Sequence, residues 1–196
     1  WTTRSHNLGV NMSLFRCLLN GLIFVSLLLC GSASAQTTSN EGGLFSLKSD
    51  LGESRGVCVD IPGFRATIDL NIPLVAHTCK PNPDAREDMV FQLDYPMEGN
   101  IYNAAYEVCF DTLETVERGT IHVRPCSDSA TQKFLRTESG ELRAMGSDLC
   151  VAVSPSPWYP AVLAGVTPEP GVTFVARAMS LAPCDEVAEE LKSWNF

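Results

Sequence analysis

The chain has 196 residues, of which 45% are hydrophobic and 19% are charged, and its formal net charge is −9 at pH 7. This length and balance suit one globular domain, or at most two small ones. The negative charge disfavours nucleic acid and anionic membranes as partners, because both carry dense negative charge of their own.

The N-terminal part of the chain predicts export. After Met12, Arg16 supplies a positive charge, residues 18–29 form an apolar run, and residues 33–35 read Ala-Ser-Ala. This order is typical of a secretory signal peptide. The apolar run is shorter than the roughly 20 residues that a membrane-spanning helix needs, so we expect no stable membrane insertion.

These features divide the chain into three parts. We expect residues 1–11 to be an upstream extension or a fragment edge, residues 12–35 to be the signal peptide, and residues 43–196 to be the folded domain of a secreted, extracellular or periplasmic protein. A lipid anchor on Cys30 is the alternative. Leu29 disfavours it, because a small residue is expected immediately before a lipidated cysteine.

Six cysteines follow the predicted signal peptide, and their even number favours disulfides in an oxidising compartment. This part of the sequence has no Cys-x-x-Cys pair and only two histidines, His77 and His122, so we expect no metal site and no cofactor. The six residues are Cys58, Cys79, Cys109, Cys126, Cys150 and Cys184.

A short cysteine phrase occurs three times in the chain. It reads "GVCVD" at residues 56–60, "EVCFD" at 107–111 and "DLCVA" at 148–152, a spacing of about 40 to 50 residues that indicates a repeat architecture. In each unit, apolar residues also stand five and three positions before a second cysteine, which predicts a half-buried strand. These residues are Leu74 and Ala76, Ile121 and Val123, and Met179 and Leu181.

Three such units predict an all-β fold, a β-trefoil of three repeats with pseudo-threefold symmetry. Each unit is too small to bury a core alone, and closure around a threefold axis removes exposed sheet edges. Phe45 precedes the first unit and "SWNF" ends the last at residues 193–196, so we expect the last strand to pair with the first. The repetition also selects one disulfide pairing within each unit: Cys58 with Cys79, Cys109 with Cys126, and Cys150 with Cys184.

The sequence resembles the ricin-type β-trefoil lectin family over about residues 43–196. The resemblance rests on the cysteine scheme, on "CVD" at residues 58–60, on "CFD" at 109–111, and on "QKF" at 132–134, where the family has Gln-x-Trp. It implies a carbohydrate-binding module without catalytic activity, whose partners are glycans or glycoconjugates. The Gln-x-Trp step reads "MVF" at residues 89–91 and "KSW" at 192–194 in the other two units.

The sugar pockets of that family imply a role for several residues of this chain. An aspartate would accept hydrogen bonds from sugar hydroxyls, and a side chain two residues before the second cysteine would stack on the sugar ring. A polar residue near the Gln-x-Trp step would add a further polar contact to the sugar. The resemblance assigns these roles to Asp60, His77 and Asp88 in the first repeat, and to Asp111, Arg124 and Gln132, with Thr131 beside it, in the second.

The three repeats are not expected to bind sugar equally well. The third repeat has Ala152 and Ala182 at the aspartate and ring positions, so no binding is expected there. The first repeat is predicted to bind best, because it alone combines a carboxylate, a flat ring and a second polar group. Structural roles are the alternative: the aspartates as turn-closing residues, His77 as an exposed strand residue, and Gln132 as a core residue bonded to the backbone.

Other function classes are weighed against the lectin. A secreted β-trefoil protease inhibitor or a protein-binding scaffold would act through the proline-rich segment at residues 154–172, where Trp158 and Tyr159 either form a contact patch or fold back on the barrel. One disulfide per repeat disfavours the inhibitor. A hydrolase would need two carboxylates at one site, and the sequence ties no two together and contains neither Gly-x-Ser-x-Gly nor His-Glu-x-x-His. Sugar specificity and oligomeric state stay open at this stage.

Overall fold

The computed structural model describes residues 42–63, 65–157 and 174–196. These residues form thirteen short β-strands and four 3-10 helices of three residues each. The strands are β1 (Gly43–Leu44), β2 (Ser46–Leu47), β3 (Val57–Asp60), β4 (Val75–Thr78), β5 (Val90–Leu93), β6 (Ile101–Asn103), β7 (Val108–Asp111), β8 (His122–Pro125), β9 (Phe134–Arg136), β10 (Leu142–Ala144), β11 (Leu149–Val153), β12 (Ala176–Pro183) and β13 (Trp194–Asn195). The 3-10 helices are η1 (Arg65–Thr67), η2 (Pro83–Ala85), η3 (Ala130–Gln132) and η4 (Glu189–Leu191).

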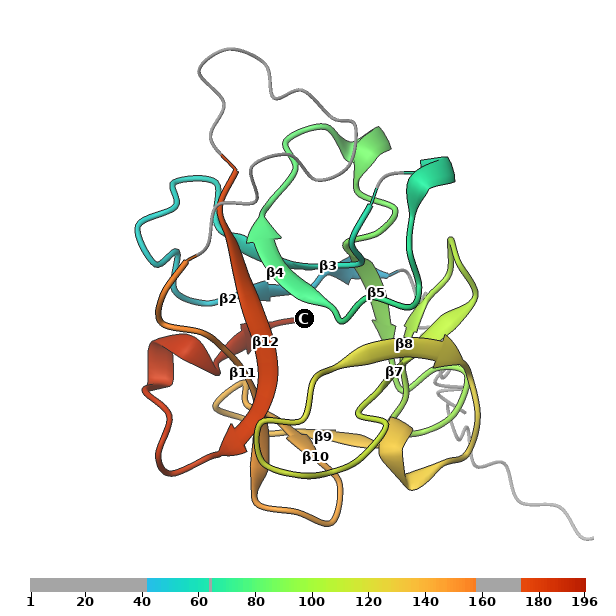
Figure 1. Ribbon diagram of the computed structural model, residues 1–196, viewed down its shortest axis with the longest axis vertical. Helices are drawn as coiled ribbons and strands as arrows, with labels where there is room; N and C mark the ends of the chain where they lie inside the picture. Colours follow the sequence, from blue (N-terminus) through green and yellow to red (C-terminus); the bar gives the residue numbers. More distant parts are fainter. Residues whose placement is uncertain (1–41, 64, 158–173) are drawn as a thin grey trace, which may run out of the picture. The chain divides into compact units, whose positions relative to one another are not determined.

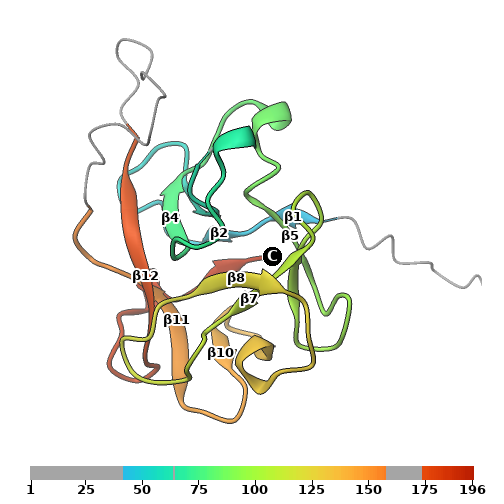
Figure 2. The ribbon, with the colours of Figure 1, turned by 45° about the vertical axis from the view of Figure 1, so that its right-hand side comes forward.

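The strands form two antiparallel sheets. One runs in the order β1-β5-β6-β7-β8, and the other in the order β13-β2-β3-β4-β12-β11-β10-β9. Each repeat contributes one long hairpin, β3–β4, β7–β8 or β11–β12, and the three hairpins surround a common centre (Figure 1). A view turned by 45° shows the same arrangement, with β7–β8 next to β11–β12 (Figure 2). This is the predicted all-β, threefold organisation.

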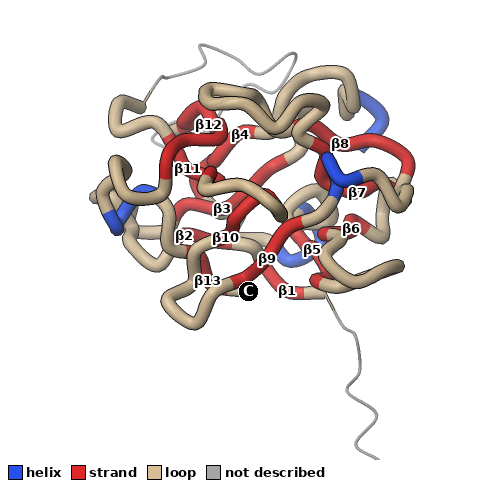
Figure 3. The backbone as a smooth tube through the Cα atoms, turned by 90° about the horizontal axis from the view of Figure 1, so that it is seen from below, coloured by secondary structure: helices blue, strands red, loops and turns tan. Residues whose placement is uncertain are grey.

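Closure of the fold depends on its two ends. Strand β13 pairs with β2, with Trp194 opposite Leu47, so the end of the domain pairs with the strand that follows Phe45 near its start (Figure 3). The Trp194 ring lies 4.8 Å from that of Phe45, and its Nε1 donates to the carbonyl oxygen of Val151 at 3.1 Å. The bond satisfies the N–H of the buried indole and also ties the third repeat to the closing strand.

The core comes from the alternating residues of the hairpins. The six residues predicted to face inward stand five and three positions before the second cysteine of each repeat. All six are at most 2% exposed. They pack with the aromatic rings of Phe45, Phe91, Phe110 and Phe134 in one cluster. Because side chains alternate across a strand, the residues between them lie on the outer face, where the aspartate and cysteine positions are.

The three disulfides pair as predicted: Cys58 with Cys79, Cys109 with Cys126, and Cys150 with Cys184. Their sequence separations are 21, 17 and 34 residues. In a chain-entropy treatment each contributes roughly 3 to 4 kcal/mol, against a typical net stability of about 5 to 15 kcal/mol. Three disulfides are also typical of proteins that fold in an oxidising compartment.

Strand β12 departs from strict repetition, because it is eight residues long and pairs on both sides. Its C-terminal part pairs with β11, whereas Ala176 to Ala178 pair with β4 of the first repeat. The first and third repeats therefore share one sheet, and Ala176 stands opposite His77. Within the described ranges, no helix is long and apolar enough to cross a membrane.

Candidate functional site

Each repeat places the same set of positions on its outer face. In the second repeat Cys109 pairs with Arg124 and Asp111 with His122, so these four residues face the same side of β7–β8. The first repeat has Cys58 opposite His77 and Asp60 opposite Val75. The third has Cys150 opposite Ala182 and Ala152 opposite Ser180.

The first repeat brings two predicted ligand groups together around a cation. The Nζ of Lys80 lies 3.5 Å from Oδ1 of Asp60 and makes a short ion pair with Oδ2 of Asp88. Asp60 is 2% exposed and Asp88 is completely buried. Burial, followed by the neighbouring Asp88 carboxylate, raises the pKa of Asp60 well above its usual value, while Lys80 opposes this rise. Burial likewise raises the pKa of Asp88.

His77, the predicted ring platform of the first repeat, is covered by protein. Its ring stacks on that of Phe174 at 5.2 Å, and the residue is only 3% exposed. Nδ1 lies 2.8 Å from the carbonyl oxygen of Thr78, which assigns the hydrogen to that nitrogen. Burial lowers the pKa of His77 to about 4. The alternative of an exposed strand residue is therefore wrong, and the face that a sugar would need is occupied by Phe174.

These contacts bear on two expectations. Asp60, His77 and Asp88 do lie together, but all three are enclosed, which gives a physical reason to expect weaker sugar binding at the first repeat than its residue types predicted. The structure also ties two carboxylates to one place, which the sequence did not. A glycosidase needs such a pair beside its substrate, and these two are instead enclosed around Lys80.

The second repeat holds its aspartate through neutral hydrogen-bond donors, and Asp111 is itself 7% exposed. Asp111 Oδ2 accepts a hydrogen bond from Nε2 of Gln132 at 2.9 Å, and Oδ1 accepts one from the backbone N–H of Leu113 at 2.7 Å. Gln132 also donates to Pro125 O at 3.1 Å and accepts from the N–H of Ser127 at 2.7 Å. Gln132 is thus a buried residue that positions Asp111 and also bonds the backbone, as the structural alternative for it predicted. The turn-closing alternative for Asp111 holds for Oδ1, which accepts from the turn backbone, but not for Oδ2.

Two further polar groups flank Asp111 on the same face. Arg124 is partly exposed, and its Nη1 donates to Leu70 O at 3.0 Å and to Val123 O at 2.8 Å. His122 bonds Thr120 Oγ1 through Nε2 at 2.8 Å, while its buried Nδ1 has no partner among the described residues. Burial, and then the charge of Arg124, lower the pKa of His122, whereas Asp111 raises it. Thr131 bonds Ser129 through its hydroxyl at 2.8 Å and lies at the edge of this site.

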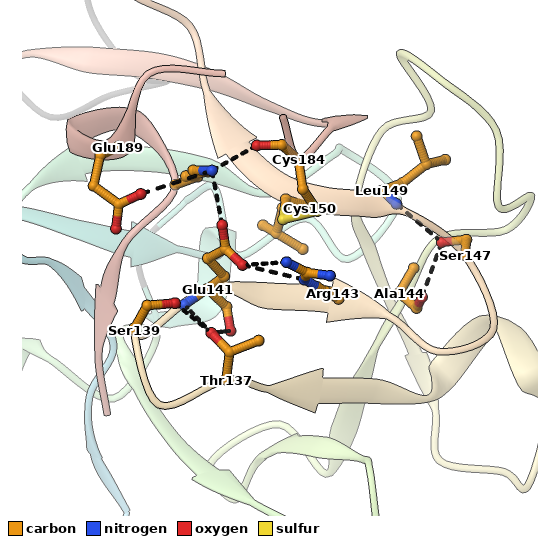
Figure 4. Close-up of a disulfide and its surroundings, with 12 residues drawn as sticks. Thr137, Ser139, Glu141, Arg143, Ala144, Ser147, Leu149, Cys150, Cys184 and Glu189 are labelled. Atoms are coloured by element: carbon orange, nitrogen blue, oxygen red, sulfur yellow. Dashed lines mark hydrogen bonds and ion pairs between the residues drawn. A yellow bond between two sulfur atoms is a disulfide. The ribbon is translucent and has the colours of Figure 1, made fainter. Parts of the chain in front are cut away.

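The third repeat uses the equivalent space for an ion-pair network (Figure 4). The Nζ of Lys192, at the glutamine position, donates to Cys184 O at 2.5 Å and lies 2.7 Å from Oε1 of Glu141. The other oxygen of Glu141 accepts from Arg143 at 2.7 Å. Hydrogen bonds from Lys192 and Arg143 lower the pKa of Glu141. Alanine stands at the aspartate position, and both oxygens of Glu141 are engaged by the cations of this network.

Sequence reasoning missed four residues that shape these sites. Lys80 and Phe174 close space near the predicted positions, and no local pattern marks them, because they contact residues of another strand. Lys192 stands at the glutamine position of the third repeat, but its pairing with Glu141 is not marked by that position. His122 had a signal. It stands two residues before Arg124, and period-two alternation places both on one face.

The proline-rich segment lies mostly outside the described residues. Residues 158–173, which include Trp158 and Tyr159, are among those not described, so the inhibitor and scaffold alternatives stay predictions. The start of the segment is anchored, because Nη1 of Arg177 donates to Ser154 O at 3.0 Å and to Pro155 O.

Comparison with solved structures identifies the fold. The chain is similar to cytolethal distending toxin from Actinobacillus actinomycetemcomitans, with a TM-score of 0.51 and 19% identity over 81% of this chain and 90% of that chain. It is also similar to the mdaA-1 domain, with a TM-score of 0.52 and 15% identity over 78% and 88%. A third match is the C-half of an earthworm R-type lectin in complex with GalNAc, with a TM-score of 0.47 and 13% identity over 77% and 95%.

At these identities the first two likenesses show the fold alone, and the third score is too low to carry an argument. No protein-family profile matches the sequence, and no curated protein matches it. The strand topology and the structural likenesses together define the class, an all-β β-trefoil of three repeats stabilised by three disulfides.

Proposed function

We propose that this chain is a secreted carbohydrate-binding module without catalytic activity, and that the second repeat is its principal site. The observation that carries the proposal is the hydrogen bond from Gln132 to Asp111. It holds the carboxylate at the outer end of β7 while each oxygen keeps a lone pair beyond the one it uses in the fold.

Sugar hydroxyls suit this acceptor. A carboxylate forms strong, charge-assisted hydrogen bonds, and one that is already oriented loses little entropy when it binds. Leu113, which is 45% exposed, offers apolar surface next to the carboxylate for the C–H face of a sugar ring. The first repeat supports the proposal by contrast, because the Lys80 ammonium already occupies its two carboxylates.

A glycan array with the secreted chain, followed by titration of the best glycan, tests the proposal. We expect Asp111→Asn to weaken binding by at least about tenfold, since a hydrogen bond to a charged group contributes about 1.5 to 3 kcal/mol. Asp60→Asn is the matched control and should leave binding unchanged. Because Asp111→Asn also disturbs Gln132, Leu113→Ala serves as a second variant that touches no polar contact and should weaken binding more modestly.

Two results would contradict the proposal. One is the absence of any glycan ligand for the folded, disulfide-bonded chain. The other is a ligand whose affinity falls with Asp60→Asn and stays constant with Asp111→Asn and Leu113→Ala, which would return the site to the first repeat.

A further inference from the structure

Arg124, at the second-repeat site, has no counter-ion among the described residues. Only Nη1 of its guanidinium has partners among the described residues, the carbonyl oxygens of Leu70 and Val123. No described carboxylate forms an ion pair with it. Asp69, adjacent to Leu70 in the chain, instead accepts from the backbone and side chain of Asn71.

The two carbonyl bonds fix the guanidinium without neutralising it. A guanidinium presents five N–H donors in a planar fork that matches a carboxylate in a bidentate geometry. Two bonds to Nη1 use one corner of this fork, and Nη2 and Nε stay available on a residue that is partly exposed. Other arginines of this acidic chain do have carboxylate partners, as Arg143 has in Glu141.

The place of Arg124 relative to Asp111 adds a second requirement on the ligand. Cys109 stands opposite Arg124 and Asp111 opposite His122, so Asp111 and Arg124 are diagonal neighbours on one face. Diagonal neighbours in an antiparallel pair are separated by roughly 7 to 8 Å, within reach of long side chains. A ligand that satisfies both residues must offer hydroxyl donors to Asp111 and an anionic group to Arg124 from opposite ends of one small ring.

We propose that the second-repeat site binds a sugar that carries a carboxylate, with the carboxylate on Arg124 and ring hydroxyls on Asp111. The proposal rests on the carbohydrate-binding function proposed above and specifies the ligand class. Uronic acids and sialic acids share this chemistry. An acidic protein repels polyanions at long range, yet that repulsion is screened beyond about 8 to 10 Å in physiological salt, whereas the contact with Arg124 is local.

Ligands that differ only in the carboxylate group separate its contribution to binding from that of the rest of the sugar. Titrations followed by two-dimensional NMR of the full secreted domain would use galacturonic acid, its methyl ester and galactose, and also N-acetylneuraminic acid and its methyl ester. We expect at least one acid to bind about tenfold or more tightly than its neutral counterpart, as loss of a charged hydrogen-bond partner predicts. If galacturonic acid shows this preference the ligand is a uronic acid, and if N-acetylneuraminic acid shows it the ligand is a sialic acid.

The variant Arg124→Gln should abolish this preference and leave binding of the neutral sugars nearly unchanged. Arg136→Gln removes the same charge from the exposed strand β9 and is the control that should keep the preference. Equal affinity for acids and esters, or a preference that survives Arg124→Gln, would overturn the inference while the proposed function stands. Failure of every sugar, neutral or acidic, to bind would overturn both.

Discussion

Replacement of Lys80 by methionine tests whether the first repeat is a structural ion-pair cluster. The substitution keeps much of the side-chain volume and removes the charge between Asp60 and Asp88. Breaking a buried ion pair by removing one partner typically costs about 3 to 5 kcal/mol, because the remaining charge stays buried without compensation. That is a large part of a typical net stability of about 5 to 15 kcal/mol.

The pH dependence of this loss carries the sharper test. Burial already raises the pKa of both carboxyl groups in the native protein, and removal of Lys80 raises them further. Between the unfolded value, about 3.9, and these higher native values, the native state binds protons that the unfolded state does not. Acid therefore stabilises the variant relative to wild type, and the stability difference should shrink as pH falls from 7.5 towards about 4.

Urea unfolding of the oxidised protein at several pH values, followed by tryptophan fluorescence, measures this difference. The control is Lys133→Met, which breaks an ion pair of 2.8 Å to Asp128, whose side chain is 83% exposed. A surface pair contributes about 0 to 1 kcal/mol. Equal losses for the two variants, or a Lys80→Met loss that stays constant with pH, would refute the account of the first repeat.

Three further predictions concern stability, each measured by the same unfolding assay. Replacement of both cysteines of Cys150–Cys184 by serine should cost about 4 kcal/mol, slightly more than the same change at Cys109–Cys126, because the enclosed separation is 34 residues rather than 17. Below pH 6.5 wild type should lose up to about 3 kcal/mol relative to His77→Gln, since the unfolded histidine takes up a proton that the native one, with a pKa of about 4, refuses. Gly140→Ala should cost more than 2 kcal/mol, roughly, because φ is +91° and a Cβ would lie 2.7 Å from the carbonyl oxygen of Trp194. An equal loss of stability from the two disulfide replacements would contradict the loop-length argument. Matching stability-versus-pH profiles of wild type and His77→Gln would contradict the histidine argument, and a Gly140→Ala variant as stable as wild type would contradict the steric one.

The fold was predictable from the sequence because its signals are local and occur three times. The cysteine phrase and the alternating residues before each second cysteine define a hairpin, and its repetition selects the disulfide pairing. The closing pair of β13 and β2 followed from the aromatic residues at the two ends. The double pairing of β12 was not predictable in this way, since it depends on which neighbour fills the space between the first and third repeats.

Residue types at the candidate sites were predictable, but their accessibility was not. His77 was assigned correctly to the outer face, and the ring that covers it, Phe174, comes from the segment just before β12, far away in the sequence. Lys80 follows Cys79 directly, yet nothing local shows that its ammonium turns back between two aspartates. Burial is a property of the assembled fold, and a short motif carries information on chemistry without information on what covers it.

The glutamine position of each repeat explains why, among the described residues, Asp111 is held without an ion pair. The loop after each second cysteine needs a polar anchor, because its backbone groups are partly buried. In the third repeat Lys192 anchors it through Cys184 O and requires a buried carboxylate, Glu141, to balance its charge. In the first repeat Met89 provides no anchor, and Lys80 with its two aspartates fills the space.

Gln132 solves the same problem in the second repeat without a charge. A neutral amide offers a donor pair and an acceptor, so it bonds Pro125 O and the N–H of Ser127 and still orients Asp111. Because no cation is needed to balance Gln132, the charge of Asp111 is not used up within the fold, and Arg124 beside it keeps a free edge. The uncharged anchor is therefore the feature that leaves both a carboxylate and a guanidinium for a ligand, which is why we place the carbohydrate site here.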